Sequence, residues 1–211
     1  ISLTAKKSGG WGWNSDKSLN LSFKISVPHN LSTNINSSGG SISLTEISGN
    51  HEINTSGGSI KVAQSDGKLT TRSSGGSFRL EEFRGNVSVQ TSGGSVKVSQ
   101  LTGDLQIGSS GGSVNLEEIE GSINASTSGG SIRAQLTNLG KSLTMKSSGG
   151  SITAVVPQGL GLDLNLSGGR VNATLSNFRE KQKKDKVVGK LNGGGIPVSM
   201  QSSGGSINLE F

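Results

Sequence analysis

The sequence predicts an all-β protein: a single-stranded, right-handed parallel β-helix whose 18-residue coils each consist of two nine-residue halves. The first supporting observation is a glycine pair that returns every 18 residues, starting at Gly39, Gly57, Gly75, Gly93, Gly111 and Gly129. The second is the alternation within each half, such as Phe78-Arg79-Leu80, which is typical of a strand with one buried face. The third is the composition. With 34 glycines and 29% apolar residues, the 211-residue chain suits a thin solenoid better than a thick globular core.

In such a coil, equivalent residues of successive turns stack about 4.8 Å apart. The sequence therefore predicts three buried apolar columns, and right-handed coiling follows from the usual hand of parallel crossovers. The first column contains Ile60, Phe78, Val96, Val114 and Ile132. The second contains Leu69, Val87, Leu105, Ile123 and Leu143. The third, near the turn between the halves, contains Ile47, Phe83, Leu101, Ile119 and Leu139.

Other repetitive β structures fit the sequence less well. A left-handed helix of hexapeptides that starts from Ile60 would bury Asp66 and Arg72, and a dry core does not accept unpaired charges. A calcium-binding β-roll needs a regular aspartate in its turns, but the aspartates of this chain are scattered. The hairpins of a β-sandwich alternate in direction and would not require the same residue types every 18 positions.

We expect a single domain over residues 1–211. Residues 1–36 would form an N-terminal strand and cap, because apolar and polar side chains alternate in the second half of this segment and a solenoid must cover its terminal coil. Trp11 and Trp13 would lie on the same side of this segment if it is extended. We interpret them as a lid over the first coil, and an aromatic platform for a sugar ring is the alternative.

Residues 37–175 would form the regular coils, with extra residues absorbed by turns at 137–140 and 157–159. A hydroxyl residue stands two positions before each glycine pair, in phase with the buried apolar positions. These residues are Thr55, Ser73, Thr91, Ser109, Thr127 and Ser147. We expect their hydroxyls to bond one another or turn carbonyls inside the corner. A nucleophilic role is disfavoured, because no histidine or acid recurs beside them.

Residues 176–197 form a charged insertion that interrupts the repeat. The stretch 170–190 carries seven basic and two acidic side chains, so it holds most of the net charge of +6. We expect a mobile loop or a β-excursion exposed to solvent. Its candidate ligand-binding residues, suited to an anionic polymer, are Lys181, Lys183, Lys184 and Lys186. Residues 198–211 would be the final coils, and the insertion keeps the register because Gly204 follows Gly168 by two full periods.

A second candidate surface is an outward column of cations next to the first apolar column. Its members are Lys61, Arg79, Lys97 and Arg133. A neighbouring outward column contains Glu46, Gln64, Glu82, Gln100 and Glu118. Opposite charges on adjacent columns are usual on a solvated strand surface and contribute little to stability. A stripe that binds an anionic glycan is the functional alternative.

The repeated Ser-Gly-Gly-Ser-Ile turns, the segment Val27-Pro28-His29-Asn30 and the closing Gly-Lys-Leu-Asn-Gly-Gly-Gly resemble the bacterial adhesin family with β-strand repeats. The resemblance extends from about residue 19 to the end of the chain. It implies an exported or surface-attached bacterial β-helix of unknown function. That family has no established catalytic residues, so the resemblance transfers none to this chain.

The sequence thus predicts a non-catalytic β-solenoid of the periplasm or cell surface, an adhesin or a binding scaffold with a cell-surface glycan or protein as its partner. A polysaccharide lyase or hydrolase is an alternative, but it would need clustered carboxylates, whereas the pairs Glu81-Glu82 and Glu117-Glu118 belong to the repeat. An ice-binding protein is another alternative, but threonine does not hold any one outward column.

We expect no catalytic, cofactor or metal site, because the chain has no cysteine and its two histidines, His29 and His51, are isolated. We also expect no specific nucleic-acid binding, since the excess positive charge is confined to one segment. The chain contains no run of 18 apolar residues, so we expect no transmembrane segment. No signal peptide is recognisable in this chain. The oligomeric state stays open.

Overall fold

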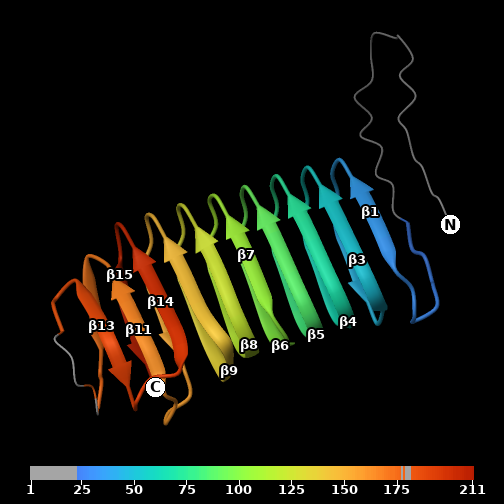
Figure 1. The fold of residues 1–211 in the computed structure, drawn as a ribbon. Helices are drawn as coiled ribbons and strands as arrows, with labels where there is room; N and C mark the ends of the chain where they lie inside the picture. Colours follow the sequence, from blue (N-terminus) through green and yellow to red (C-terminus); the bar gives the residue numbers. More distant parts are fainter. Residues whose placement is uncertain (1–22, 177, 179–181) are drawn as a thin grey trace, which may run out of the picture.

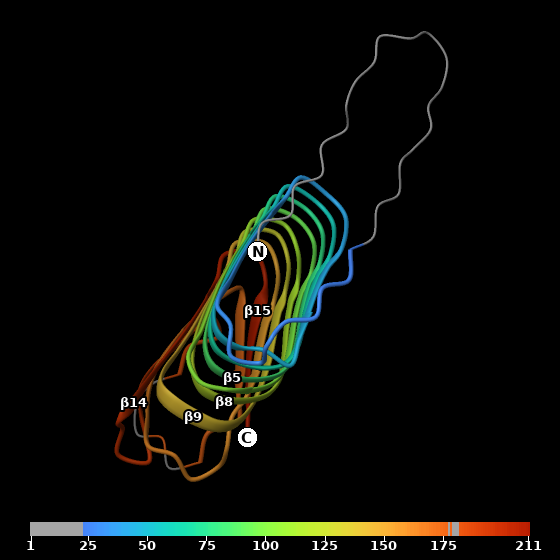
Figure 2. The same ribbon diagram turned by 90° about the vertical axis from the view of Figure 1, so that its right-hand side faces the viewer.

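The computed structural model describes residues 23–176, 178 and 182–211. Its strands stack along one axis and pair in parallel from coil to coil, and the described residues contain no helix. Figure 1 shows the strands side by side along the stack, and Figure 2 shows the coils end on, superposed as flattened loops. The prediction of a parallel β-helix is confirmed. Trp11, Trp13 and Lys181 lie outside the described residues.

The regular coils contain strands that recur with the 18-residue period. They are β1 (Thr33–Ser37), β2 (Ile42–Thr45), β3 (Ser48–Thr55), β4 (Ile60–Ser73), β5 (Phe78–Thr91), β6 (Val96–Thr102), β7 (Leu105–Ser109), β8 (Val114–Thr127), β9 (Ile132–Ser147) and β10 (Ile152–Val155). The pairing of β4 with β5 aligns Ile60 with Phe78 and Leu69 with Val87. Because the register equals one period, each side chain lies against its equivalent in the next coil.

The first and second apolar columns are confirmed, since their members are in register and all are at most 3% exposed. The third column needs a correction. Ile119 aligns with Leu136, and Leu139 aligns with Gly121 instead, although both leucines are buried. The two extra residues of β9 enter after this corner, because Gly121 aligns with Leu139 at an offset of 139 − 121 = 18, whereas Ile123 aligns with Leu143 at an offset of 143 − 123 = 20.

The glycine corner is tightly stacked. A Cβ atom on Gly94 would lie 1.9 Å from the carbonyl oxygen of Gly76 in the preceding coil, and Gly94 has a φ of 63°. Both the close approach and the left-handed backbone exclude other residues. By contrast, the nearest atoms to a Cβ on Gly93 are 3.8 Å away. The second glycine of the pair is therefore the one that the stacking requires.

A second kind of corner is built without glycine. Left-handed backbone, with φ between 48° and 58°, occurs at Glu46, Gln64, Glu82, Gln100 and Glu118. In the pairing of β4 with β5, Ala63 aligns with Glu81 and Ser65 with Phe83, so one residue of each strand stands out of the ladder between them. The register is the same on both sides, so the left-handed residue turns both strands at the same point and is not a bulge in either. The outward column predicted from the sequence is thus also a corner of the five coils from β2 to β8.

The inward hydroxyls bond carbonyls of the glycine turns, as expected. Thr55 Oγ1 donates to the carbonyl oxygen of Gly57 at 2.6 Å, and Thr91 repeats this bond with Gly93 at 2.6 Å. In later coils the hydroxyl reaches the preceding turn, as Ser147 Oγ does with the carbonyl of Gly130 at 2.9 Å. These bonds satisfy turn carbonyls that the ladder leaves free.

The C-terminal strands do not follow the order of the sequence. They are β11 (Leu162–Ser167), β12 (Arg170–Ala173), β13 (Lys186–Leu191), β14 (Ile196–Ser202) and β15 (Ser206–Glu210). β14 lies between β9 and β11 and is parallel to both (Figure 1). β15 pairs in parallel with β10 and with β12. The expected register is confirmed, because Arg170 aligns with Ser206, 36 residues later, but the final strands lie within the stack and not at its end. A spacing in multiples of 18 fixes the register of a strand but not its layer.

The basic insertion is a β-excursion that covers the end of the stack. Antiparallel bridges join Phe178 to Leu191 and Gln182 to Val187, so Phe178 and Gln182 lie against β13. β13 in turn pairs antiparallel with β11, and its Val187 and Leu191 are buried. Of the two alternatives drawn from the sequence, the structure has the β-excursion, and alternate residues of β13 complete the core while the others face solvent. Lys183, at the hairpin turn, is exposed as expected.

Replacing Lys183, Lys184 and Lys186 with serine is expected to shift the thermal midpoint by no more than about 2 °C, because exposed charges contribute little to stability. The matched variant Val187→Asp, which places a charge in the core, should lower the midpoint by several times that amount. Circular dichroism melts of both variants check this. A large loss in the triple-serine variant would show that the lysines hold the hairpin in place.

Candidate ligand-binding groove

A shallow groove follows the glycine corner along the solenoid axis and has a volume of about 790 Å³. One wall is an outward column in which residues of successive coils align. This column contains Asn36, Asn54, Arg72, Gln90, Gly108 and Ser126. The other wall is a column of exposed serines, one in each turn. These are Ser38, Ser56, Ser74, Ser92 and Ser110. Polar side chains of these two columns therefore define the site.

Backbone hydrogen bonds hold the serine column in place. The amide of Ser74 donates to the carbonyl of Thr55 at 3.1 Å, and the amide of Ser92 donates to the carbonyl of Ser73 at 3.0 Å. The coil stacking thus continues into the turn before the glycine pair. Because these amides are already paired, the serines offer the groove their hydroxyl groups rather than their N–H groups.

The groove extends into the C-terminal coil. A smaller hollow of about 290 Å³ shares Ser109 and Ser126 with the first and adds Lys146, Gln201 and Ser203. Gln201, on the intercalated strand β14, aligns with Lys146 on β9. Seven coil steps separate Asn36 from Gln201, which corresponds to about 34 Å along the axis.

The groove carries little charge. Arg72 Nη1 lies 3.3 Å from Glu52 Oε1, so this cation already has a partner. Lys146 is the other basic side chain along the walls. No carboxylate lines either hollow, so the groove lacks the pair of acids that glycoside hydrolysis requires. In the described ranges, no three histidine or acidic side chains gather as metal ligands. Hydroxyl and amide groups are what the groove offers to a ligand.

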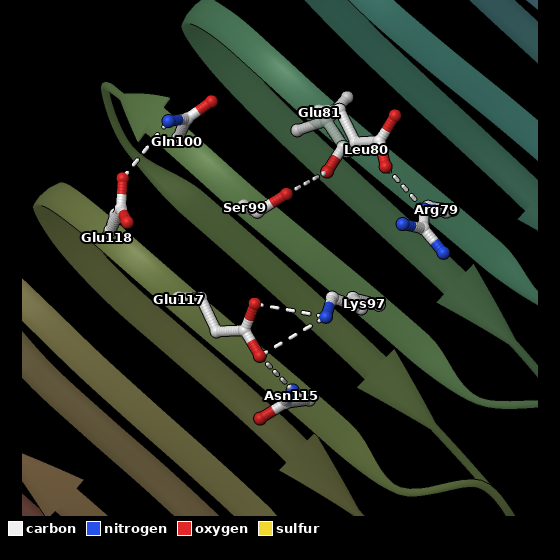
Figure 3. A network of polar contacts seen from close by, with 9 residues as sticks. All are labelled: Arg79, Leu80, Glu81, Lys97, Ser99, Gln100, Asn115, Glu117 and Glu118. Carbon is white, nitrogen blue, oxygen red and sulfur yellow. Dashed lines mark hydrogen bonds and ion pairs between the residues drawn. The ribbon is translucent and has the colours of Figure 1, made fainter.

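A second groove, of about 580 Å³, follows the left-handed corner and is acidic. Its walls include Gln64, Glu82, Gln100 and Glu118, and Gln100 Nε2 donates to Glu118 Oε2 at 3.1 Å (Figure 3). Glutamate and glutamine alternate along this column, so each carboxylate has an amide rather than another carboxylate as its neighbour. This alternation reduces the repulsion between like charges in successive coils, so the Glu/Gln pattern of the column is explained by the stability of the stack.

The predicted cation column is in register but largely neutralised. Lys61 Nζ lies 3.1 Å from the Glu81 carboxylate. Arg79 Nε lies 2.6 Å from the same carboxylate, and Lys97 Nζ lies 3.0 Å from Glu117 (Figure 3). The hydrogen bonds from Lys61 and Arg79 lower the pKa of Glu81, and the hydrogen bond from Lys97 lowers that of Glu117. The two acids that pair with the cation column, Glu81 and Glu117, each stand one position before a residue of the left-handed corner, Glu82 and Glu118.

The structure does not gather the predicted ligand-binding residues into one site. The cation column lies on β4, β5, β6 and β9, where Arg133 aligns with Asn115, and none of its residues lines the polar groove. Lys183, Lys184 and Lys186 belong to the hairpin at the C-terminal end. The sequence analysis does not predict this groove, although one pattern points to it: a serine precedes every regular glycine pair. That each of these serines is exposed follows from the geometry of the corner and not from the pattern.

One buried titratable group lies near the N-terminal end. His51 is 2% exposed and occupies the second apolar column above Leu69. Its Nδ1 is 3.0 Å from Thr33 Oγ1, and its Nε2 has no partner. Desolvation lowers the pKa of His51 and outweighs the opposing effect of Asp66. The folded protein therefore favours the neutral imidazole.

This burial predicts a stability that falls in mild acid. Above the ordinary pKa of 6.5 the histidine is neutral in both the folded and the unfolded protein, so its burial does not change the free energy of unfolding with pH. As the pH falls below 6.5, the unfolded chain takes up a proton that the folded chain resists, and the free energy of unfolding decreases. His51→Leu should remove this part of the pH dependence. Urea unfolding at pH 8 and pH 5 checks it, and an unchanged decrease in the variant would assign the effect to other groups.

Fold and site together define a β-solenoid repeat protein with a long polar surface groove. The Toastrack DUF4097 family model matches residues 4–210, and the chain belongs to this family. No curated protein and no solved structure matches the chain. The family is an uncharacterised one, so the expected adhesive role does not follow from membership. Within the described part of the chain, no helix has the length and apolar character needed to cross a membrane.

Proposed function

We propose that this Toastrack solenoid is a non-catalytic binding scaffold that holds a linear polysaccharide along its polar groove. The observation that carries the proposal is the groove itself, which continues over successive coils with the same kinds of hydroxyl and amide side chains. A ligand that matches it has to be extended and rich in hydroxyl groups, and a sugar chain has both properties. In agreement with the family resemblance, we place this scaffold outside the cytoplasm as an adhesin-type module.

The repetition matters because each contact is weak. A hydrogen bond contributes about 0.5–1.5 kcal/mol net, so one sugar on one coil would bind poorly. A chain that follows the axis repeats the contact at every coil after a single loss of translational and rotational freedom. The wall residues, such as Gln90 and Ser92, are thus better suited to binding a polymer than a small molecule.

Charge argues against a nucleic acid in this groove. Binding to a phosphate backbone depends on several unpaired basic side chains. The first hollow contains one, Arg72, and Glu52 already pairs with it. The basic hairpin at Lys183 and Lys184 is a separate surface, and it supports at most a general attraction to anionic polymers.

A glycan array tests the proposal with a matched pair of variants. The double variant Ser92→Phe, Ser110→Phe fills the groove, while Ser95→Phe, Ser113→Phe adds the same bulk on exposed serines across the glycine pair, outside the groove. We expect the wild type and the second variant to bind the same polysaccharides and the first variant to lose them. Equal binding by both variants, or no binding by the wild type, would reject the groove as the site.

A further inference from the structure

The intercalated C-terminal segment occupies a slot that the rest of the chain builds. The slot is formed by β9 and β11 on one face and by β10 and β12 on the other, and every ladder partner of β14 and β15 belongs to these strands. The four acceptor strands end at Ala173, before the segment begins at Ile196. The segment therefore fills a gap in a stack that precedes it in the chain.

The core and the neighbouring strands hold this segment in the way in which a donated strand is held in strand-exchange complexes. Val198, Met200, Ile207 and Leu209 are each at most 1% exposed, so four side chains enter the core from this segment. Its backbone pairs with a parallel strand on either side, as in proteins in which one chain supplies a missing strand to another. A second copy of the chain offers the identical segment and the identical slot.

The connection to the segment is short and ready to open. Four residues, from Asn192 to Gly195, join β13 to β14, and all have positive φ, with values of 50°, 88°, 81° and 145°. Three of them are glycines, which adopt extended conformations as easily as this turn. Short connections that reverse the chain favour exchange of the element that follows them.

We propose that the slot also accepts β14 and β15 from a second copy, which gives a dimer with reciprocally exchanged C-terminal segments. The same ladders and core contacts form in the monomer and in the dimer, so the two differ mainly by the hinge and by the cost of association. During folding the slot stays open until the last residues arrive, and at high concentration a neighbouring chain competes for it. In this dimer Gln201, a wall of the polar groove, comes from the other copy.

Engineered cysteines distinguish exchange from simple contact, because the chain has no cysteine of its own. Thr144 on β9 aligns with Ser199 on β14, and both are half-buried. The single variants T144C and S199C are mixed, unfolded, refolded together and oxidised. The control is T70C mixed with S88C, an aligned pair in the same column on β4 and β5, which stay within one chain. The double variants T144C/S199C and T70C/S88C show that each disulfide can close.

We expect a disulfide-linked heterodimer of T144C with S199C whose ratio to monomer rises about tenfold when the concentration rises tenfold, as mass action requires. The T70C and S88C mixture should give only background. Exchange is refuted if the T144C/S199C double variant closes within one chain while the mixture gives no more heterodimer than the control. If T144C/S199C does not form its disulfide while T70C/S88C does, β14 does not lie beside β9, and the slot does not exist as described.

Discussion

The variant Gly94→Ala is expected to lose about 3–5 kcal/mol of unfolding free energy, while Gly93→Ala should change it by no more than about 1 kcal/mol. The two substitutions add the same methyl group to adjacent positions. At Gly94 the methyl would lie 1.9 Å from a backbone oxygen of the preceding coil, and the backbone is left-handed. Backbone oxygens in a stacked ladder cannot retreat without breaking hydrogen bonds, so the clash is not easily relieved.

At Gly93 the same methyl meets nothing closer than 3.8 Å, and the backbone is not in the left-handed region. Alanine there also reduces the entropy of the unfolded chain, which offsets part of any cost. Urea denaturation of the two variants measures the difference directly. Similar losses at both positions would show that the glycine pair serves the flexibility of the turn and not the close stacking of coils.

Deleting residues 196–211 is expected to unfold the C-terminal third of the solenoid while the earlier coils survive. Four fully buried side chains leave with the segment, at about 1.5–3 kcal/mol each, which is comparable to the whole stability of a typical domain. The deletion also leaves β9 and β11 without the strand between them. Because each coil contacts only its neighbours, β4 and β5 should remain folded.

Hydrogen exchange with mass spectrometry checks this result strand by strand. Amides of β11 and β12 should lose protection in the deleted protein, and amides of β4 and β5 should keep it. If residues 196–211 were merely a final coil at the end of the stack, their removal would leave β11 and β12 protected. Retained protection in these two strands would therefore contradict the intercalated arrangement.

Much of the fold could be predicted because the period of 18 acts at every coil. Ile60 and Phe78 share a column because they are one period apart and face inward, and both facts are visible in the sequence. The same reasoning fails where the period is locally broken. The sequence places the extra residues of this coil in a turn at 137–140, but they enter between Leu139 and Leu143 within the continuous strand β9, and Ile119 aligns with Leu136.

The order of the last coils could not be predicted for a different reason. A strand at Val198 matches the repeat equally well in any layer, so periodicity gives no preference between the end of the stack and a gap within it. What decides the layer is which open edges remain after β11, β12 and β13 have formed. That is a property of the assembled chain and not of any local pattern.

The polar groove could not be predicted because two hydroxyl positions adjoin in each turn. The inward hydroxyls, such as that of Thr55, are visible in the sequence because they are in phase with the apolar residues. The exposed serine that follows each of them, such as Ser56, has no such phase and is not distinguishable from an ordinary turn residue. Only the stacked geometry shows that these serines and the column of Asn54 and Arg72 form two walls of one groove.

The most direct test of the binding proposal is the dependence of affinity on ligand length. Linear oligosaccharides of one sugar type, taken from the class that the array identifies, are titrated calorimetrically in order of increasing length. The affinity should rise about two- to tenfold with each added sugar until the chain spans the groove, as one further hydrogen bond per coil would give. Ser92→Phe, Ser110→Phe should abolish this rise. An affinity that does not depend on length, or a rise that the variant leaves intact, would contradict the groove as the binding site.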